Sequence, residues 1–317
     1  MGAMRDWQDL VVPGTPSRAK ARAGDPGHAP RGKAVVIENV IVPLDGTEGS
    51  RAALPVGRIV AKLYEATLHV VFVDKGEEAH RPRQTLEELG LDAQEIRGVV
   101  MDNLHGDPAA AILRSARELS SVLLVMCTHT GGHADTGELG SVAEAVLSGV
   151  PERIILISPE GVPESWQLRR ILLAHDGTRS ADVAIAPAAD LAHRSGAEVL
   201  ALHVGARTSP EPGEPGSLPA PRYIDQPQHE WPAWADEFLD RMMTLGTSPA
   251  DVNFKLLVTG GQPGSEIAQF TRDNSVDLLV AASRGRWDNE HFEKLRVIIR
   301  RCGCPVLLVH TTEVPSR

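Results

Sequence analysis

The sequence predicts two tandem α/β domains, each built on a doubly wound parallel sheet. The chain carries the same pattern twice, because residues 41–47 (Ile-Val-Pro-Leu-Asp-Gly-Thr) return as residues 172–178 (Leu-Leu-Ala-His-Asp-Gly-Thr), an offset of 176 − 45 = 131. Within each copy, apolar runs alternate with segments of helical periodicity. The apolar runs are continuous, which indicates strands covered on both faces, as in a parallel sheet between two helical layers.

The offset grows along the chain, which indicates an insertion in the second copy. Residues 105–109 (His-Gly-Asp-Pro-Ala) match residues 260–264 (Gly-Gly-Gln-Pro-Gly) at an offset of 263 − 108 = 155. The extra residues fall in the stretch 205–234, which contains seven prolines. Because proline has no backbone N–H to donate to a strand ladder, we expect this stretch to be a long surface excursion.

In the first copy we expect five strands joined by helices. Pro108 supports one of these helices, because proline fits a first helical turn, where its missing N–H costs nothing. The expected strands are 40–44, 68–73, 95–101, 122–126 and 153–157. The expected helices are 51–63, 85–91, 108–119 and 142–147.

The second copy repeats this order. Its expected strands are 170–174, 199–204, 253–258, 278–281 and 306–309, and its helices begin near residues 180, 234, 263 and 292. The apolar runs 153–157 and 306–309 each end a copy, and each would otherwise leave an exposed strand edge. Exposed edges promote aggregation, so we expect these two strands to pair and to join the halves.

Composition limits the classes of partner. The net charge of the 317 residues is −10, and residues 1–36 carry six basic and three acidic side chains, which leaves −10 − 3 = −13 for the rest. Such acidic domains disfavour a nucleic-acid or anionic-membrane surface. The segment 1–37 has no signal-peptide core and is expected to be a disordered leader, with a basic nucleic-acid arm or a transit peptide as alternatives. The two domains are expected at 38–160 and 161–317.

Two further features bear on location and on metal binding. No apolar stretch approaches the roughly 20 residues of a membrane span, so we predict a cytoplasmic protein without a membrane partner. The three cysteines give no disulfide framework, and Cys302-Gly303-Cys304 is interpreted as a pair of structural thiols. His129 and His133 stand near Asp135 in a glycine-rich loop that is not preorganised, and we predict no metal site there.

Several segments resemble the universal stress protein family in its tandem two-domain form, and it is their order, present twice, that makes the resemblance specific. The segments are Pro43-Leu44-Asp45-Gly46-Thr47, Val70-Val71-Phe72-Val73, Gly106-Asp107-Pro108, Gly140-Ser141-Val142-Ala143-Glu144, Leu202-His203-Val204 and Cys304-Pro305-Val306-Leu307-Leu308-Val309. The resemblance implies one five-stranded, Rossmann-like domain in each half. It also implies that the two domains pack as an intramolecular pseudo-dimer.

In the ATP-binding branch of this family, the loop after the fourth strand reads Gly, two residues, Gly, nine residues, Gly-Ser. Glycines let backbone amides approach phosphate oxygens, and the following helix start adds donors. Here Cys127 and Thr130 stand at the two leading glycine positions, whereas Gly140-Ser141 is kept at the same spacing. Gly131 and Gly132 follow one position later, and Asp135 and Glu138 add negative charge that opposes a triphosphate.

The resemblance places ATP or another adenine nucleotide in the first half. Asp45 would accept a hydrogen bond from adenine or ribose, and Val73 would present backbone groups to adenine. The alternative is that Asp45 only caps its helix and that Val73 belongs to the core. The candidate residues are Pro43, Asp45, Val73, Thr128, Thr130, Gly131, Gly140, Ser141 and Val142.

The second half is expected to be a degenerate, structural copy. Phe292-Glu293 or Leu295-Arg296 stand where Gly-Ser would be needed, depending on the alignment. Arg284 and Arg286 could attract an anion, but two arginines beside a loop are more often a solvated face.

The leading functional hypothesis is a non-enzymatic stress-response protein that is regulated by adenine nucleotide, with no catalytic residue assigned and weak ATP hydrolysis left open. One alternative is a ligand-free interaction scaffold. Another is an adenine-nucleotide-using enzyme of the related α/β group, such as an adenylating ATP pyrophosphatase. Such enzymes need a Ser-Gly-Gly-rich turn where this chain has Asp45-Gly46-Thr47 and Asp176-Gly177-Thr178. A homodimer and a regulatory protein partner of unknown identity are left open.

Overall fold

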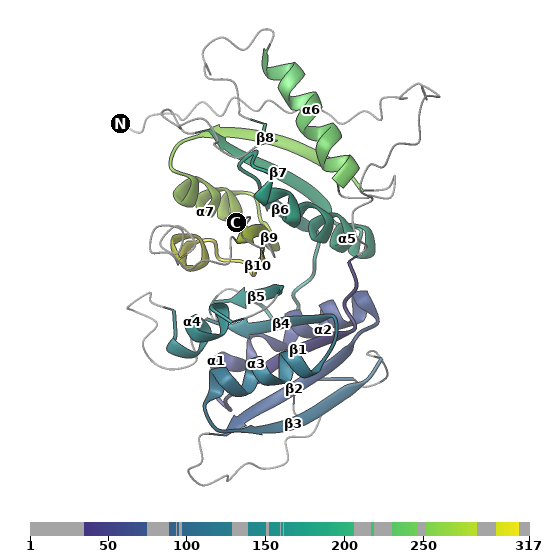
Figure 1. Cartoon of the computed structure of the whole chain (residues 1–317), viewed down its shortest axis with the longest axis vertical. Coiled ribbons are helices and arrows are strands. Elements are labelled where there is room, and N and C mark those ends of the chain that lie inside the picture. Colours follow the sequence, from purple (N-terminus) through teal and green to yellow (C-terminus); the bar gives the residue numbers. More distant parts are fainter. Residues whose placement is uncertain are drawn as a thin grey trace, which may run out of the picture.

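Figure 1 shows the computed structural model of the chain. It describes residues 35–74, 89–92, 94, 97–128, 139–149, 152–158, 160, 162–205, 217–218, 230–245, 252–283 and 296–310. The first half contains β1 (Asn39–Leu44), α1 (Glu48–Arg51), α2 (Leu54–Tyr64), β2 (Thr67–Asp74), β3 (Val99–His105), α3 (Pro108–Glu118), β4 (Val122–Cys127), α4 (Ser141–Leu147) and β5 (Arg153–Ile157).

The second half follows the same plan. It contains β6 (Arg170–Ala174), a 3-10 helix (Ser180–Ala184), α5 (Ile185–Ser195), β7 (Glu198–Gly205), α6 (Glu230–Leu245), β8 (Phe254–Gly260), α7 (Pro263–Asp273), β9 (Leu278–Ser283) and β10 (Val306–His310). Residues 296–301 are also helical. In the part of the chain that the structure describes, no helix is both long and apolar enough to cross a membrane.

All ten strands form one sheet in the order β3-β2-β1-β4-β5-β10-β9-β6-β7-β8. Within each half every pairing is parallel. This confirms the predicted fold class of two doubly wound, five-stranded parallel sheets. In both halves the first strand lies between the second and the fourth, so the strand order reverses there and leaves a crevice at the carboxyl ends.

The two halves join through their closing strands, as the sequence predicts. β10 pairs antiparallel with β5, and Leu307 stands opposite Ile155 in the register. Both side chains are buried, at 2% and 0% exposed. In Figure 1 this seam lies in the middle of the molecule, between the first-half and second-half sheets. The prediction that the pair covers what would otherwise be two apolar edges is therefore confirmed.

The core runs through the seam on both faces of the sheet. One buried cluster contains Val42 and Leu68 of the first half together with Leu173 and Phe238 of the second. The cluster on the opposite face likewise joins residues of both halves, such as Leu124 and Leu308. The halves are therefore packed as one body around a shared sheet.

Two first-half elements differ from the expectations. The predicted helix 51–63 is two helices, because Pro55 has no N–H to bond back into the preceding turn, so α2 starts afresh at Leu54 with this proline in its first turn. The predicted strand 95–101 is instead Val99–His105. This strand is at the edge of the sheet and exposes most of its side chains, including Asp102 and Asn103. Its apolar run therefore ends at Met101 and does not mark its second half.

Two second-half helices also differ from the expectations, and some predicted elements cannot be compared. The helix expected near 180 begins as a 3-10 helix and becomes α5 at Ile185. The helix expected near 234 begins at Glu230, so the last residues of the excursion 205–234 are helical. The helix start near 292, most of the expected helix 85–91 and most of the excursion lie outside the described residues.

Candidate functional site

The first-half crevice opens where β1 and β4, neighbouring strands of the sheet, reach their carboxyl ends. β1 ends at Leu44 and is followed by Asp45, and β4 ends at Cys127 and is followed by Thr128. Pro43 lies just before this edge, buried within β1 and opposite Val71 of β2. The fold therefore brings the residues that follow these two strands to one edge.

Asp45 organises the loop after β1. Its Oδ1 accepts hydrogen bonds from the Thr47 N–H (3.0 Å) and the Thr47 hydroxyl (2.6 Å). Thr47, not Asp45, caps α1, because its Oγ1 accepts from the Ser50 N–H at 3.2 Å. Gly46 has φ +85°, a left-handed conformation that favours glycine. Asp45 is exposed and follows directly after the carboxyl end of β1.

β2 supplies the next wall. The pairing of β1 with β2 ends at Leu44 opposite Phe72, whereas β2 stays paired with β3 through Asp74 opposite His105. Val73 therefore lies one residue beyond the end of the β1 ladder, at the level of Asp45. Its backbone therefore extends past the end of the β1–β2 pairing, next to the carboxyl end of β1.

The loop after β4 returns to the strand end from which it leaves. The Thr128 N–H donates to the Ile157 carbonyl at 2.8 Å, and the Thr128 carbonyl accepts from the Gly140 N–H at 2.9 Å. Gly140 is the N-cap residue of α4, so Ser141 and Val142 form the first turn of that helix. Ser141 is exposed and Val142 is half-buried. Of the remaining candidates, Thr130 and Gly131 lie outside the described residues.

Cys127, at the first of the two lost glycine positions, packs into the core. Its side chain is 4% exposed, and its Sγ donates to the Ser50 carbonyl at 3.7 Å, which ties β4 to α1 beneath the Asp45 loop. Burial raises the pKa of the Cys127 thiol to about 12, with a further contribution from the negative charge of Asp45. The thiol is therefore protonated at neutral pH and does not act as a nucleophile.

The second half contains an equivalent loop with the same hydrogen bonds. Asp176 Oδ1 accepts from the Thr178 N–H (2.9 Å) and the Thr178 hydroxyl (2.5 Å), and Gly177 has φ +81°. Beyond β9 the loop that would hold phosphate, including Arg284, Arg286 and Phe292-Glu293, lies outside the described residues. Arg296 is described, and its guanidinium donates to the Glu144 carboxylate of α4, so it links the two halves.

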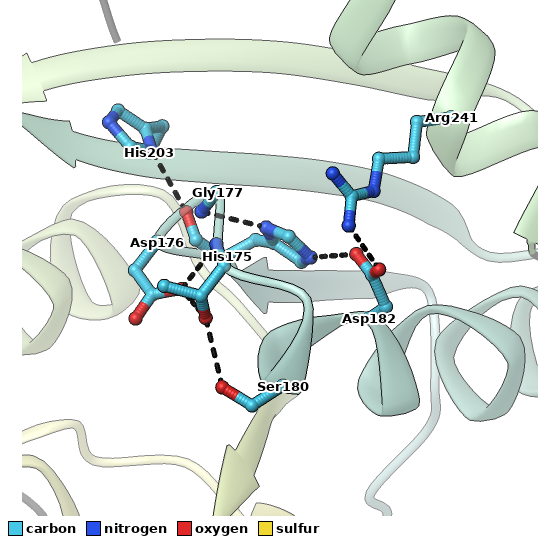
Figure 2. Close-up of polar contacts among 8 residues, drawn as sticks. His175, Asp176, Gly177, Ser180, Asp182, His203 and Arg241 are labelled. Atoms are coloured by element: carbon cyan, nitrogen blue, oxygen red, sulfur yellow. Dashed lines mark hydrogen bonds and ion pairs between the residues drawn. The ribbon is translucent and has the colours of Figure 1, made fainter. Parts of the chain in front are cut away.

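Beneath this second loop lies a polar network that sequence reasoning missed (Figure 2). The His175 Nδ1 accepts the Gly177 N–H at 3.1 Å, so the ring proton is on Nε2, which donates to Asp182 Oδ1 at 3.2 Å. Arg241 of α6 donates to the other oxygen of Asp182. Three separate elements therefore supply this network.

A second histidine extends the network towards β7. The His203 Nδ1 lies 3.1 Å from the His175 carbonyl, to which it donates, and the ring packs edge-on against Trp234, with ring centroids 5.1 Å apart. Burial lowers the pKa of His203. A signal was present in the repeat, because at the offset of 131 these histidines replace Leu44 (175 − 131 = 44) and Phe72 (203 − 131 = 72) of the first copy.

The described residues contain no group of three or more His, Cys, Asp or Glu side chains placed to hold a metal ion. The three cysteines are free and buried. His129, His133 and Asp135 lie outside the part of the chain that the structure describes.

The fold defines a class: a doubled parallel α/β protein whose strand order reverses once in each half. The model of the universal stress protein family matches residues 37–157 and, again, residues 167–310. The chain therefore belongs to the universal stress protein family, with two such domains in tandem.

Solved structures with the same tandem arrangement support the fold. A universal stress protein from Archaeoglobus fulgidus DSM 4304 is 17% identical with a TM-score of 0.57, and the match covers 85% of this chain and 97% of that one. A protein of unknown function from Pseudomonas aeruginosa PAO1 is 13% identical with a TM-score of 0.59, covering 86% and 92%. A universal stress protein from Archaeoglobus fulgidus in complex with dAMP matches only about half of this chain (45%, and 97% of that one), at 19% identity and a TM-score of 0.30.

Proposed function

We propose that this protein is a non-enzymatic stress-response protein whose first half binds ATP or another adenine nucleotide as a regulatory ligand. The observation that carries the proposal is the open edge between β1 and β4. The exposed Asp45, the backbone of Val73 beyond the β1 ladder and the start of α4 at Gly140-Ser141, which Thr128 holds, all follow strand ends at this edge of the sheet. Membership of the family adds support, because a universal stress protein has been crystallised with dAMP.

Each group has a chemical role in this proposal. The Asp45 carboxylate accepts a hydrogen bond from an adenine amino group or a ribose hydroxyl, and Thr47 holds it in place. The Val73 backbone meets the adenine edge. Gly140, held by the Thr128 carbonyl, presents the amides of the first turn of α4 and the Ser141 hydroxyl to phosphate oxygens. Thr130 and Gly131 complete the proposed loop, and Val142 and Pro43 support it from the helix and the strand.

In this proposal the bound nucleotide regulates the protein and is not a substrate that it turns over. The one thiol at this edge, that of Cys127, is buried and protonated, and Asp45 is engaged by Thr47, so neither is arranged as a nucleophile with its own base. Nucleotide occupancy would then be read by a partner protein. A ligand-free scaffold remains the alternative, and it predicts no nucleotide after gentle purification.

Calorimetric titration with ATP tests the site assignment. Asp45→Ala combined with Gly140→Leu should abolish binding, and Asp45→Ala alone should weaken it at least roughly tenfold, because a charged acceptor is lost. The matched control is Asp176→Ala, which removes the equivalent carboxylate and the equivalent Thr178 bonds from the second half.

The control variant should bind ATP like the wild type. Unchanged affinity in the double variant would overturn the assignment to the first half. Loss of binding in Asp176→Ala alone would instead place the ligand in the second half.

A further inference from the structure

The glycine of the second loop is covered by a distant part of the chain. The Leu218 N–H donates to the Gly177 carbonyl at 2.8 Å, although the two residues are 218 − 177 = 41 positions apart. A Cβ atom at Gly177 would lie 2.5 Å from the Leu218 carbonyl oxygen. A Cβ atom at Gly46, which has nearly the same φ, would meet no described atom within 4 Å. The two loops thus differ in what faces them.

Helix α6 holds Leu218 from the other side. The indole Nε1 of Trp234 donates to the Leu218 carbonyl at 3.4 Å, and Trp234 is itself buried against Phe238, with ring centroids 4.9 Å apart. The Leu218 side chain packs on the core cluster that contains these two rings. The N–H, the carbonyl and the side chain of Leu218 therefore each have a partner in the second half.

The polar network beneath the loop fixes the same glycine. His175 accepts the Gly177 N–H, and Leu218 donates to the Gly177 carbonyl, so the two peptide groups flanking this residue are both held. His175 is oriented in turn by Asp182 and Arg241 (Figure 2). The first half has Leu44 at the equivalent position, and a leucine side chain cannot accept a hydrogen bond as the His175 ring does.

The contact lies where the second-half crevice opens. Gly177 follows β6, and β6 lies between β9 and β7, at the reversal of the strand order. The ring of His203, on β7, lies 3.8 Å from the position of a Gly177 Cβ, next to the Leu218 carbonyl. A ligand entering on the β7 side of this edge would meet the Leu218 backbone first.

We propose that Ser217–Leu218 is an intramolecular peptide ligand of the second half, which covers the crevice at Gly177, whereas no described residue covers the equivalent Gly46 of the first half. The occupant is this pair of residues, whose Leu218 is recognised through its backbone by Gly177 and Trp234 and through its side chain by the core. Adenine nucleotide is thereby excluded from the second half, so the chain binds one nucleotide and not two. This last consequence rests on the proposed function of the first half, whereas the contact itself does not.

Amide hydrogen exchange of Leu218, measured on the full chain without ligand, tests the contact directly. In the wild type this amide should exchange at least roughly tenfold more slowly than in an unstructured peptide. Gly177→Ala should remove most of that protection, because its Cβ cannot coexist with the Leu218 carbonyl at 2.5 Å. Gly46→Ala is the matched control: it carries the same strain at positive φ without the contact, and it should leave the Leu218 amide protected.

A milder variant covers the case in which Gly177→Ala does not fold. Trp234→Phe keeps an aromatic ring but removes the donor to the Leu218 carbonyl, and it should speed the exchange by several-fold. Exchange of the wild-type Leu218 amide at the unstructured rate would overturn the proposal, as would equal protection in the two glycine variants. Addition of ATP should leave the exchange unchanged, and an ATP-dependent loss of protection would show that nucleotide displaces the segment and would overturn the exclusion. Failure of ATP to bind at all would count against the first-half function alone.

Discussion

The two Asp-Gly-Thr loops form the same hydrogen bonds and both expose their aspartate, yet the glycine of one is exposed and that of the other is covered. In each, the aspartate Oδ1 accepts from the N–H and the hydroxyl of the threonine two residues on, and the glycine has a φ between +81° and +85°. Gly46 is exposed, whereas Gly177 is buried. Local sequence thus determines the conformation of the loop, and residues from other parts of the chain determine whether its glycine is exposed.

The covering is accompanied by a change of chemistry beneath the loop. Two apolar positions of the first copy, Leu44 and Phe72, are His175 and His203 in the second. The first half packs apolar side chains under an exposed loop, whereas the second half builds a polar network under a loop that its own chain covers. Duplication has therefore preserved the scaffold while the two crevices acquired different environments.

The two halves are packed as one body through the pairing of β5 with β10. Substitutions in this strand pair should have the largest effect on stability. Lysine at Ile155 or at Leu307 places a charge in a buried strand pair, which should cost more than about 4 kcal/mol of unfolding free energy. The double variant should unfold in two separate transitions in urea, followed by circular dichroism. Val36→Lys is the control, because Val36 is 51% exposed and the change should stay within about 0.5 kcal/mol. A single transition with an unchanged midpoint in the double variant would contradict the role of the seam.

An exchange of residues between the copies sharpens the comparison. His175→Leu installs the first-half residue and leaves the Gly177 N–H and one Asp182 oxygen without their buried partner, which should cost about 1–3 kcal/mol of unfolding free energy. The reciprocal Leu44→His should cost a similar amount, because Arg51 stands where Asp182 would be needed (182 − 131 = 51). Urea denaturation at pH 7.5 measures both. A neutral effect of His175→Leu would show that the network does not stabilise the second half.

The pH dependence should also differ between the copies. Burial lowers the pKa of His203, so below about pH 6.5 the unfolded state binds more protons than the folded state and stability falls as the pH is lowered. Above that value the group is neutral in both states. His203→Phe, the first-half residue, should remove a contribution of at most about 1.4 kcal/mol per pH unit between pH 6.5 and 5. Burial also lowers the pKa of His310, to about 4. The unfolding free energy of both proteins therefore keeps a residual dependence on pH in this range. An identical slope with and without His203 would contradict this prediction.

Much of the fold could be predicted because its signals are local and repeated. Continuous apolar runs mark the buried strands, and the Asp45-Gly46-Thr47 motif predicts a tight turn before a helix. The bounds of β3 were predicted four residues too early, because an edge strand with Asp102 and Asn103 exposed needs no apolar run over its whole length. The split of α1 from α2 was readable at Pro55, where a missing N–H interrupts the helix.

The candidate site was predictable only in outline. The strand ends locate Asp45, Val73 and Thr128, because parallel topology brings carboxyl ends to one edge. The network of His175, Asp182 and Arg241 joins three elements that no local pattern connects. The contact of Leu218 with Gly177 depends on how a proline-rich insertion folds back across 41 residues (218 − 177), which neither composition nor periodicity specifies.

The antiparallel pairing of β5 with β10 also limits the number of strand edges that are left for pairing with another chain. Because β5 pairs with β10, the strand order of the first half is followed by the same order reversed in the second half. The two apolar closing strands thus cover each other's edges within a single chain. What remains at the rims is β3, with Asp102 and Asn103, and β8, where Lys255 is paired with Glu198. Such charged and polar rims resist further strand addition. The two closing strands are thus already paired within one chain, and the strand edges left among the described elements are those of β3 and β8.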